Sequence, residues 1–104
     1  MITDEIFTQL RTIHKDLTEN EFAKTYLGTS RSYLCNRRNN GKDVSNDVAL
    51  TLYATLTSKA RQWRASAKLE SDIRYHKRWG QLSELYFSLA DRLSEMILTR
   101  AKSN

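Results

Sequence analysis

The chain has 104 residues, of which 39% are hydrophobic, and its formal net charge is +5. This length supports one compact domain, and the sequence contains no apolar run of the roughly 18 residues that a membrane span needs. One cysteine and two histidines exclude an internal disulfide and a zinc cluster, so we expect a cytoplasmic protein with no metal and no cofactor.

The first half of the chain predicts two helices. Proline is absent and apolar residues recur at intervals of three and four, which favours an all-α fold of about five helices. The first helix covers about residues 3–16, with Ile6 and Leu10 on its apolar stripe. The second begins at Thr18, where "TENE" forms a capping box, and ends at Gly28.

Three further helices follow. The third starts at Thr29 or Ser30 and stops at "NNG", residues 39–41. Ser45 caps a fourth helix with a core-like face of Ala49, Leu52, Tyr53, Leu56, Ala60 and Trp63. The pattern weakens around residues 66–72, where we expect a break and Ser71 as the cap of a long fifth helix. This divides a single compact domain into residues 1–65, a helix-turn-helix bundle, and residues 66–104, a helical extension.

The fifth helix carries a stripe with alternating steps of four and three residues, as in a coiled coil. Tyr75 begins this stripe, which we interpret as a homodimer seam of Trp79, Leu82, Tyr86, Leu89, Leu93 and Met96. The alternative is that the stripe only completes the core of a single chain by packing on the N-terminal bundle. A third arrangement combines the two, with the extension both packing on the bundle and dimerising.

Positive charge is clustered along the chain. Residues 1–29 hold five acids and three cations, whereas residues 30–42 hold four cations and no acid. Residues 59–78 hold seven cations and two acids. Such clusters are typical of an electrostatic footprint for nucleic acid.

A series of short motifs runs in order through residues 10–56: Leu10-Arg11, Leu17-Thr18, Phe22-Ala23, Gly28-Thr29-Ser30, Asn40-Gly41-Lys42, and Leu52 with Leu56. In this order and spacing, the segment resembles the lambda-repressor-like, Xre-type family of bacterial and phage DNA-binding domains. The resemblance implies a helix-turn-helix whose second helix, the third of the chain, enters the major groove.

Two features depart from the family pattern. Ala23 and Gly28 are five positions apart instead of four, so the turn carries an extra residue and the second helix is rotated or lengthened. Arg37 falls at an inward position of the third helix, where a buried, unpaired guanidinium would be costly. It either extends to solvent, meets Asp43 or Asp47, or lies in a register in which Tyr33 supplies the inward face.

The family's positions assign roles on the third helix. The resemblance implies base contacts from Arg31, Ser32, Asn36 and Asn39, whose side chains suit guanine and adenine edges. It implies phosphate contacts from Thr18, Ser30, Arg38, Asn40 and Lys42. Cys35 also lies on the outer face, and we interpret it as a bystander thiol.

Catalysis is not expected, because no nucleophile, base and orienting group, and no paired carboxylates, form a recognisable set. The sequence therefore predicts a dimeric, sequence-specific DNA-binding transcriptional regulator with half-sites about one helical turn apart. The alternative is a helix-turn-helix-like adaptor or antiactivator that binds another regulatory protein, which Arg37 and the altered turn favour.

Overall fold

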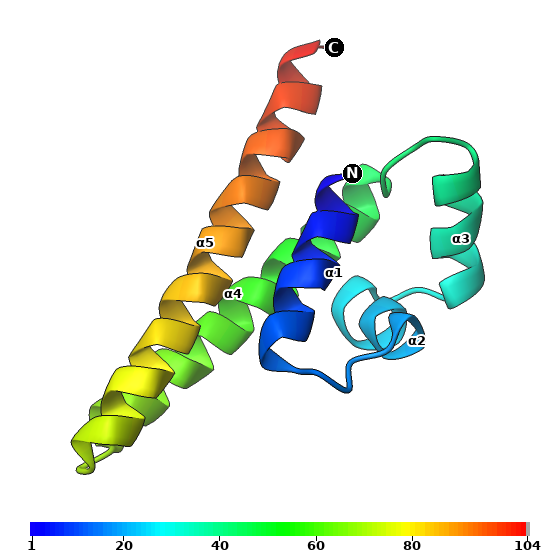
Figure 1. Cartoon of the computed structure of the whole chain (residues 1–104). Helices are drawn as coiled ribbons and strands as arrows, with labels where there is room; N and C mark the ends of the chain where they lie inside the picture. The colour runs from blue at the N-terminus through cyan, green and yellow to red at the C-terminus, as the bar shows by residue number, and fades with distance from the viewer. Residues whose placement is uncertain (104) are drawn as a thin grey trace. The chain divides into compact units, whose positions relative to one another are not determined.

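The chain is helical, as its sequence predicts. The structure, a computed structural model, describes residues 1–103, and within that range it contains five α-helices, one π-helix and no strand. The elements are α1 (Ile2–Ile13), α2 (Glu19–Glu21), η1 (Phe22–Leu27), α3 (Arg31–Asn39), α4 (Asn46–Leu69) and α5 (Ile73–Ser103) (Figure 1). The all-α class is confirmed. Asn104, the last residue of the predicted extension, lies outside the described residues.

The chain divides into two compact units, residues 1–52 and 53–103, which we call the N-terminal unit and the C-terminal unit. The division falls inside α4, between Leu52 and Tyr53, whereas the predicted boundary follows residue 65. Helix α4 therefore contributes residues to both units. In the described residues, no helix has both the length and the hydropathy needed to cross a bilayer.

The N-terminal unit has an apolar core drawn from each of its longer elements. Ile6 and Leu10 of α1 are fully buried, as the predicted stripe requires. Helix α1 ends at Ile13, three residues earlier than predicted, because His14 has left the helical conformation (φ −109°, ψ 82°). Other buried residues of this core are Phe22, Ala23, Tyr26, Leu27, Leu34, Val44, Ala49 and Leu52.

The segment before the turn, where the sequence predicts an altered helix, is wound as the π-helix η1. The N–H of Gly28 donates to the carbonyl of Ala23, five residues back, where an α-helix would use the carbonyl four residues back. Gly28 then turns the chain with φ +65°. All four apolar side chains of η1 are buried. The sequence predicts a rotated or lengthened helix here, whereas the structure gives this segment π-helical winding.

The predicted hydroxyl caps at the starts of α2 and α3 are confirmed. The hydroxyl of Thr18 accepts a hydrogen bond from the N–H of Glu21, and that of Ser30 from the N–H of Tyr33, each at 3.1 Å. Helix α3 ends at Asn39, and Gly41 closes it with φ +66°. Both ends of α3 are thus defined by hydrogen bonds local in sequence.

Arg37 occupies the inward side of α3, as predicted, and is half-buried. Its Nε donates to the backbone carbonyl of Asp43 at 2.8 Å, so its partner is main chain rather than a carboxylate. Tyr33 is also half-buried, and its hydroxyl accepts a hydrogen bond from the N–H of Ser45 at 2.9 Å. These two polar contacts flank Leu34, which is 3% exposed. A guanidinium on the inner side of α3 is therefore tolerated because it is hydrogen-bonded.

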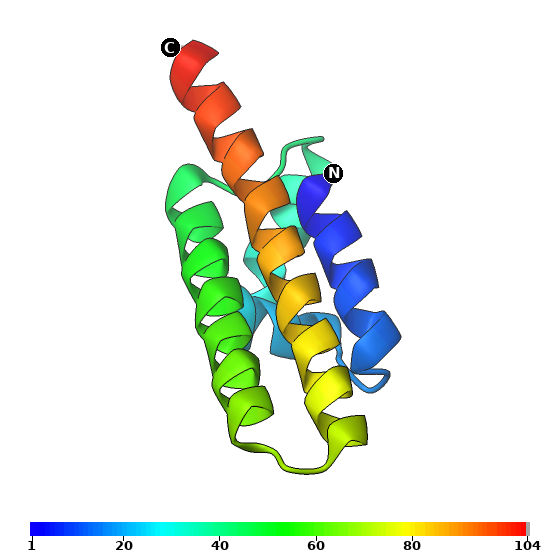
Figure 2. The same cartoon turned by 90° about the vertical axis from the view of Figure 1, so that its left-hand side faces the viewer.

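In the C-terminal unit, α5 runs antiparallel to the part of α4 that follows Leu52 (Figure 2). The two helices are joined within the predicted break, although α4 continues to Leu69. The predicted cap, Ser71, is wrong: the carboxylate of Asp72 accepts the N–H of Arg74 at 2.9 Å and begins α5. The buried hydroxyl of Ser83 donates to the carbonyl of Ala60 at 2.9 Å and ties the two helices together.

The predicted dimer seam on α5 is partly covered within a single chain. Tyr86, Leu89 and Leu93 are at most 5% exposed. Trp79, Leu82 and Met96 are half-buried. Tyr75 is 48% exposed, so the stripe does not begin where its periodicity suggests. Three of the six seam residues therefore need no second chain to cover them, and the dimer stays a prediction.

Candidate nucleic-acid interface

Helix α3 turns its predicted base readers to solvent. Arg31, Ser32, Asn36 and Asn39 are all exposed, whereas Leu34 is buried. At 3.6 residues per turn, these four positions lie within an arc of about 140°. Cys35 lies inside that arc and is half-buried. One side of α3 thus presents a guanidinium, a hydroxyl and two carboxamides, while the other side anchors the helix.

Arg31 is placed where a cation is locally unfavourable. It is the first residue of α3, and the first turn of this helix holds no acid. The helix macrodipole disfavours a positive charge there by about 0.3–1 kcal/mol. Glu19 of α2 offsets this cost, because its Oε2 lies 3.6 Å from Nε of Arg31. The Arg31 side chain remains 64% exposed.

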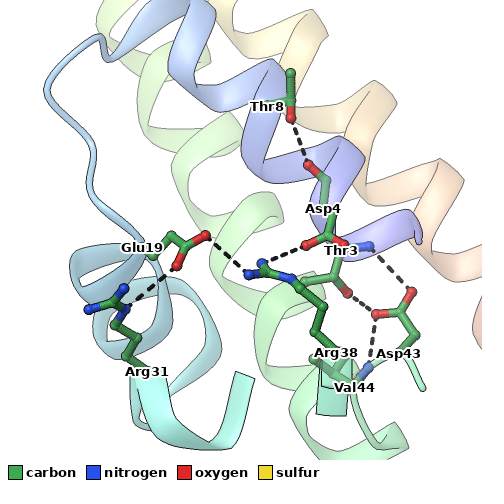
Figure 3. A network of polar contacts seen from close by, with 8 residues as sticks. All are labelled: Thr3, Asp4, Thr8, Glu19, Arg31, Arg38, Asp43 and Val44. Atoms are coloured by element: carbon green, nitrogen blue, oxygen red, sulfur yellow. Dashed lines mark hydrogen bonds and ion pairs between the residues drawn. The ribbon is translucent and has the colours of Figure 1, made fainter. Parts of the chain in front are cut away.

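Arg38 is engaged by two carboxylates from different elements (Figure 3). One terminal nitrogen lies 2.9 Å from Asp4 of α1, and the other lies 3.3 Å from Glu19 of α2. The hydrogen bond to Asp4 and the charges of both acids raise the pKa of the Arg38 guanidinium above its ordinary value, while burial opposes this rise. The positive charge of Arg38 is therefore compensated within the chain, and three elements meet at this side chain.

A second polar link joins α1 to the loop after α3. The carboxylate of Asp43 accepts hydrogen bonds from the hydroxyl and the N–H of Thr3, the latter at 3.4 Å. It also accepts the N–H of Val44 at 2.8 Å. Since the carbonyl of the same residue holds Arg37, Asp43 links the first turn of α1 to α3. These contacts fix α3 against the rest of the N-terminal unit.

The other predicted phosphate contacts fall into two groups. Thr18 and Ser30 use their hydroxyl oxygens as helix caps, but each hydroxyl keeps its own hydrogen to donate. Asn40 and Lys42 are exposed at the C-terminal end of α3. Among residues 1–103, neither side chain has a recorded hydrogen bond or ion pair, so both are available to a ligand.

A groove of about 580 Å³ adjoins the N-terminal end of α3. Its lining holds three cations and two acids together with apolar and polar groups: Phe7, Arg11, Lys15, Asp16, Leu17, Thr18, Glu19, Asn20 and Arg31. The guanidinium of Arg11 lies over the ring of Phe7, 5.8 Å from its centre. The groove therefore extends the mixed polar surface of α3 back to the end of α1.

Sequence reasoning missed Asp4 and Glu19 as partners of the arginines, and Arg11 and Lys15 as neighbours of Arg31. The first turns of α1 and α2 are acidic, which signals only the ordinary dipole preference. The four-residue interval between Arg11 and Lys15 was a local signal for one shared surface. The meeting of Glu19 with α3 depends on tertiary packing, which no local pattern encodes.

Comparison with curated proteins and with solved structures finds no match. A family profile does match, and it covers residues 3–103, nearly the whole chain. The chain therefore belongs to a family of unknown function, DUF6626.

Proposed function

We propose that this protein is a cytoplasmic, sequence-specific regulator that binds duplex DNA by inserting α3 into the major groove. The observation that carries the proposal is the outward orientation of the four predicted base readers on a nine-residue helix capped at both ends. A helix of this length presents about two turns to base edges, as recognition helices do. The buried Leu34 and the contacts of Asp43 hold its inner side.

The exposed side chains suit both kinds of DNA contact. Asn36 and Asn39 match the donor and acceptor pair of adenine, and Arg31 matches the two acceptors of guanine. Ser32 can hydrogen-bond to either base. Thr18, Ser30, Asn40 and Lys42 remain our candidates for phosphate contacts, which fix register without reading sequence. Arg38 is not among them now, because both of its terminal nitrogens already face carboxylates.

A homodimer would place two copies of α3 on adjacent half-sites, roughly 34 Å apart. We propose that the half-buried part of the α5 stripe, Trp79, Leu82 and Met96, contributes to such a dimer. Sedimentation of the full chain tests this, with Leu82→Glu as the disrupting variant. A monomer at every concentration, with unchanged behaviour of the variant, would contradict dimerisation through this stripe.

The test of DNA binding is selection from random duplexes of about 30 base pairs, enough for two half-sites one turn apart. We expect one sequence to be enriched and to bind at least about 1,000-fold more tightly than the starting pool. Asn36→Ala should weaken binding to that sequence by about 1–3 kcal/mol and leave binding to the pool unchanged. Failure to enrich any sequence would refute the proposal.

One observation favours the adaptor as a second candidate. Of the four cations in residues 30–42, Arg31 and Arg38 are near carboxylates and Arg37 is bonded to a carbonyl. This leaves less free positive charge for phosphates than the sequence implies. An adaptor predicts that a photo-crosslinker at Asn36 captures one regulatory protein that a crosslinker at Gln62 does not, and that duplex selection enriches nothing.

A further inference from the structure

The carboxylate of Glu19 lies between two arginines of α3 and contacts them with different oxygens (Figure 3). Oε1 lies 3.3 Å from a terminal nitrogen of Arg38, and Oε2 lies 3.6 Å from Nε of Arg31. The other terminal nitrogen of Arg38 lies 2.9 Å from Asp4. The charges therefore alternate along a chain of four side chains, from Asp4 through Arg38 and Glu19 to Arg31.

The two arginines in this chain of side chains differ in which of their nitrogens contact carboxylates. Arg38 has both terminal nitrogens on carboxylates, and its side chain is 36% exposed. Arg31 meets Glu19 through Nε, and its side chain is much more exposed. The fork of terminal nitrogens on Arg31 is therefore left to solvent, at the first turn of the proposed recognition helix. A planar fork of two donors fits two acceptors side by side.

We propose that Glu19 positions Arg31 to bind a guanine base in the major groove, and that Arg38, held by Asp4, fixes Glu19 for this task. Guanine presents N7 and O6 as adjacent acceptors, which the two terminal nitrogens of an arginine bind together. The ion pair between Glu19 and Nε of Arg31 favours some orientations of the guanidinium before DNA arrives, which reduces the ordering cost of binding. This inference rests on the DNA-binding function proposed above.

Glu19 could act in two ways, by neutralising the arginines or by positioning Arg31, and these two roles predict different binding behaviour. If Glu19 only neutralised the arginines, removing its charge would strengthen binding to every DNA and steepen the salt dependence. If Glu19 positions Arg31, removing its charge weakens the preference for one base at one position. The base preference at that position is therefore the decisive measurement, and the overall affinity is not.

The experiment uses the full chain and the duplex enriched by selection, together with variants of that duplex in which each base pair is replaced in turn. Arg31→Ala should abolish the preference for one guanine, a loss of about 5- to 100-fold. Glu19→Gln should reduce the preference at the same position by a smaller factor than Arg31→Ala does, and leave the other positions unchanged. Glu21→Gln is the matched control, since it removes the same charge from an exposed residue two positions along.

A modified base provides a readout that a merely structural role would not change. Replacing the guanine with 7-deazaguanine removes the N7 acceptor and should weaken binding of the wild-type chain. The same replacement should have less effect on Glu19→Gln and none on Arg31→Ala. Arg38→Met should reduce the guanine preference as Glu19→Gln does, and thermal unfolding of each variant checks that it remains folded.

The outcomes distinguish the two proposals. If the wild-type chain enriches no duplex sequence, both the DNA-binding function and this inference are refuted. If a sequence is enriched and Asn36→Ala weakens it, but Glu19→Gln leaves every base preference intact, DNA binding stands and the positioning role is refuted. A gain in affinity of Glu19→Gln for all duplexes alike would also refute positioning, because that is the behaviour of a neutralising charge.

Discussion

Each unit contains a cluster of three aromatic side chains, and the two clusters differ in burial. In the N-terminal unit, the ring centre of Phe22 lies 5.0 Å from that of Phe7 and 5.7 Å from that of Tyr26. Phe22 itself is 1% exposed. In the C-terminal unit, Trp79 lies 6.2 Å from Trp63 and 5.8 Å from Tyr75, and both tryptophans are half-buried. Phe22 and Tyr26 are therefore core, with Phe7 half-buried beside them, whereas all three rings of the second cluster reach the surface.

The polar contacts differ in the same way. In the N-terminal unit, Arg38 and Asp4 are 34 residues apart in sequence, and Thr3 and Asp43 are 40 apart. At the turn between α4 and α5, in the C-terminal unit, Asp72 bonds to Arg74, two residues away. Tertiary contacts therefore orient α3, while the turn between α4 and α5 is organised locally. A fixed α3 is what base reading would require.

The contrast in burial should appear as a contrast in stability. Phe22→Ala removes a ring that is almost completely buried, so we expect the free energy of unfolding to fall by about 3–5 kcal/mol. Trp79→Ala removes a larger ring that is half-buried, and its loss should be smaller. Urea denaturation measures both. Equal losses would show that the two clusters contribute equally to the free energy of unfolding, contrary to their difference in burial.

The two glycines with positive φ give a matched pair within the N-terminal unit. Gly28→Ala should destabilise by about 2–3 kcal/mol, because φ is +65° and the new Cβ would lie 3.3 Å from Cγ2 of Thr51. Gly41→Ala has the same strain (φ +66°) but no atom within 4 Å, so we expect about 1–2 kcal/mol. If thermal unfolding shows equal losses of stability for the two variants, the contact with Thr51 does not add to the cost at Gly28.

The C-terminal unit should instead gain stability from a glycine substitution. Gly80 lies inside α5, and a Cβ there would meet nothing within 4 Å. Gly80→Ala should therefore raise the free energy of unfolding by about 0.5–1 kcal/mol through helix propensity. Chemical denaturation checks the sign. A loss would mean that this part of α5 needs a close approach that the structure does not contain.

The smallest expected effect concerns pH and the cap of α5. The side chain of Arg74, and then its N–H, lower the pKa of Asp72 below the ordinary value. The stabilisation is thus present above the unfolded pKa of about 3.9 and is lost as pH falls through the lower folded pKa. Asp72→Asn should slightly lower the melting temperature at neutral pH, with the difference vanishing near the acid limit. A constant difference at all pH values would exclude this carboxylate as the titrating group.

Local features of the fold were predictable from the sequence. The caps at Thr18 and Ser30 and the stop at Gly41 are confirmed because each depends on residues within one turn. The early end of α1 and the cap at Asp72 were missed, since several polar residues compete at each helix end. Such boundaries depend on which nearby groups satisfy the free carbonyls at the end of α1 and the free N–H groups at the start of α5.

The candidate site was predictable only in part. The family resemblance implied that Asn36 and Asn39 lie on the outer side of α3, and in the structure both are exposed while Leu34 is buried. The carboxylate that meets Arg31 and Arg38 could not be predicted, because it comes from a helix 19 residues away from Arg38 in sequence. A charge count treats all cations in residues 30–42 as equivalent, whereas tertiary packing gives each a different neighbour.

The π-helical winding of η1 has a consequence for how chains of this kind are compared. A π-helical turn holds about one residue more than an α-helical turn, so a chain with this winding can hold an additional residue without a longer loop. Two proteins can then share the same backbone turn although the number of residues between their corresponding motif positions differs by one. A search for distant relatives of this chain should therefore compare backbone conformation around this turn and allow the number of residues in the preceding helix to vary.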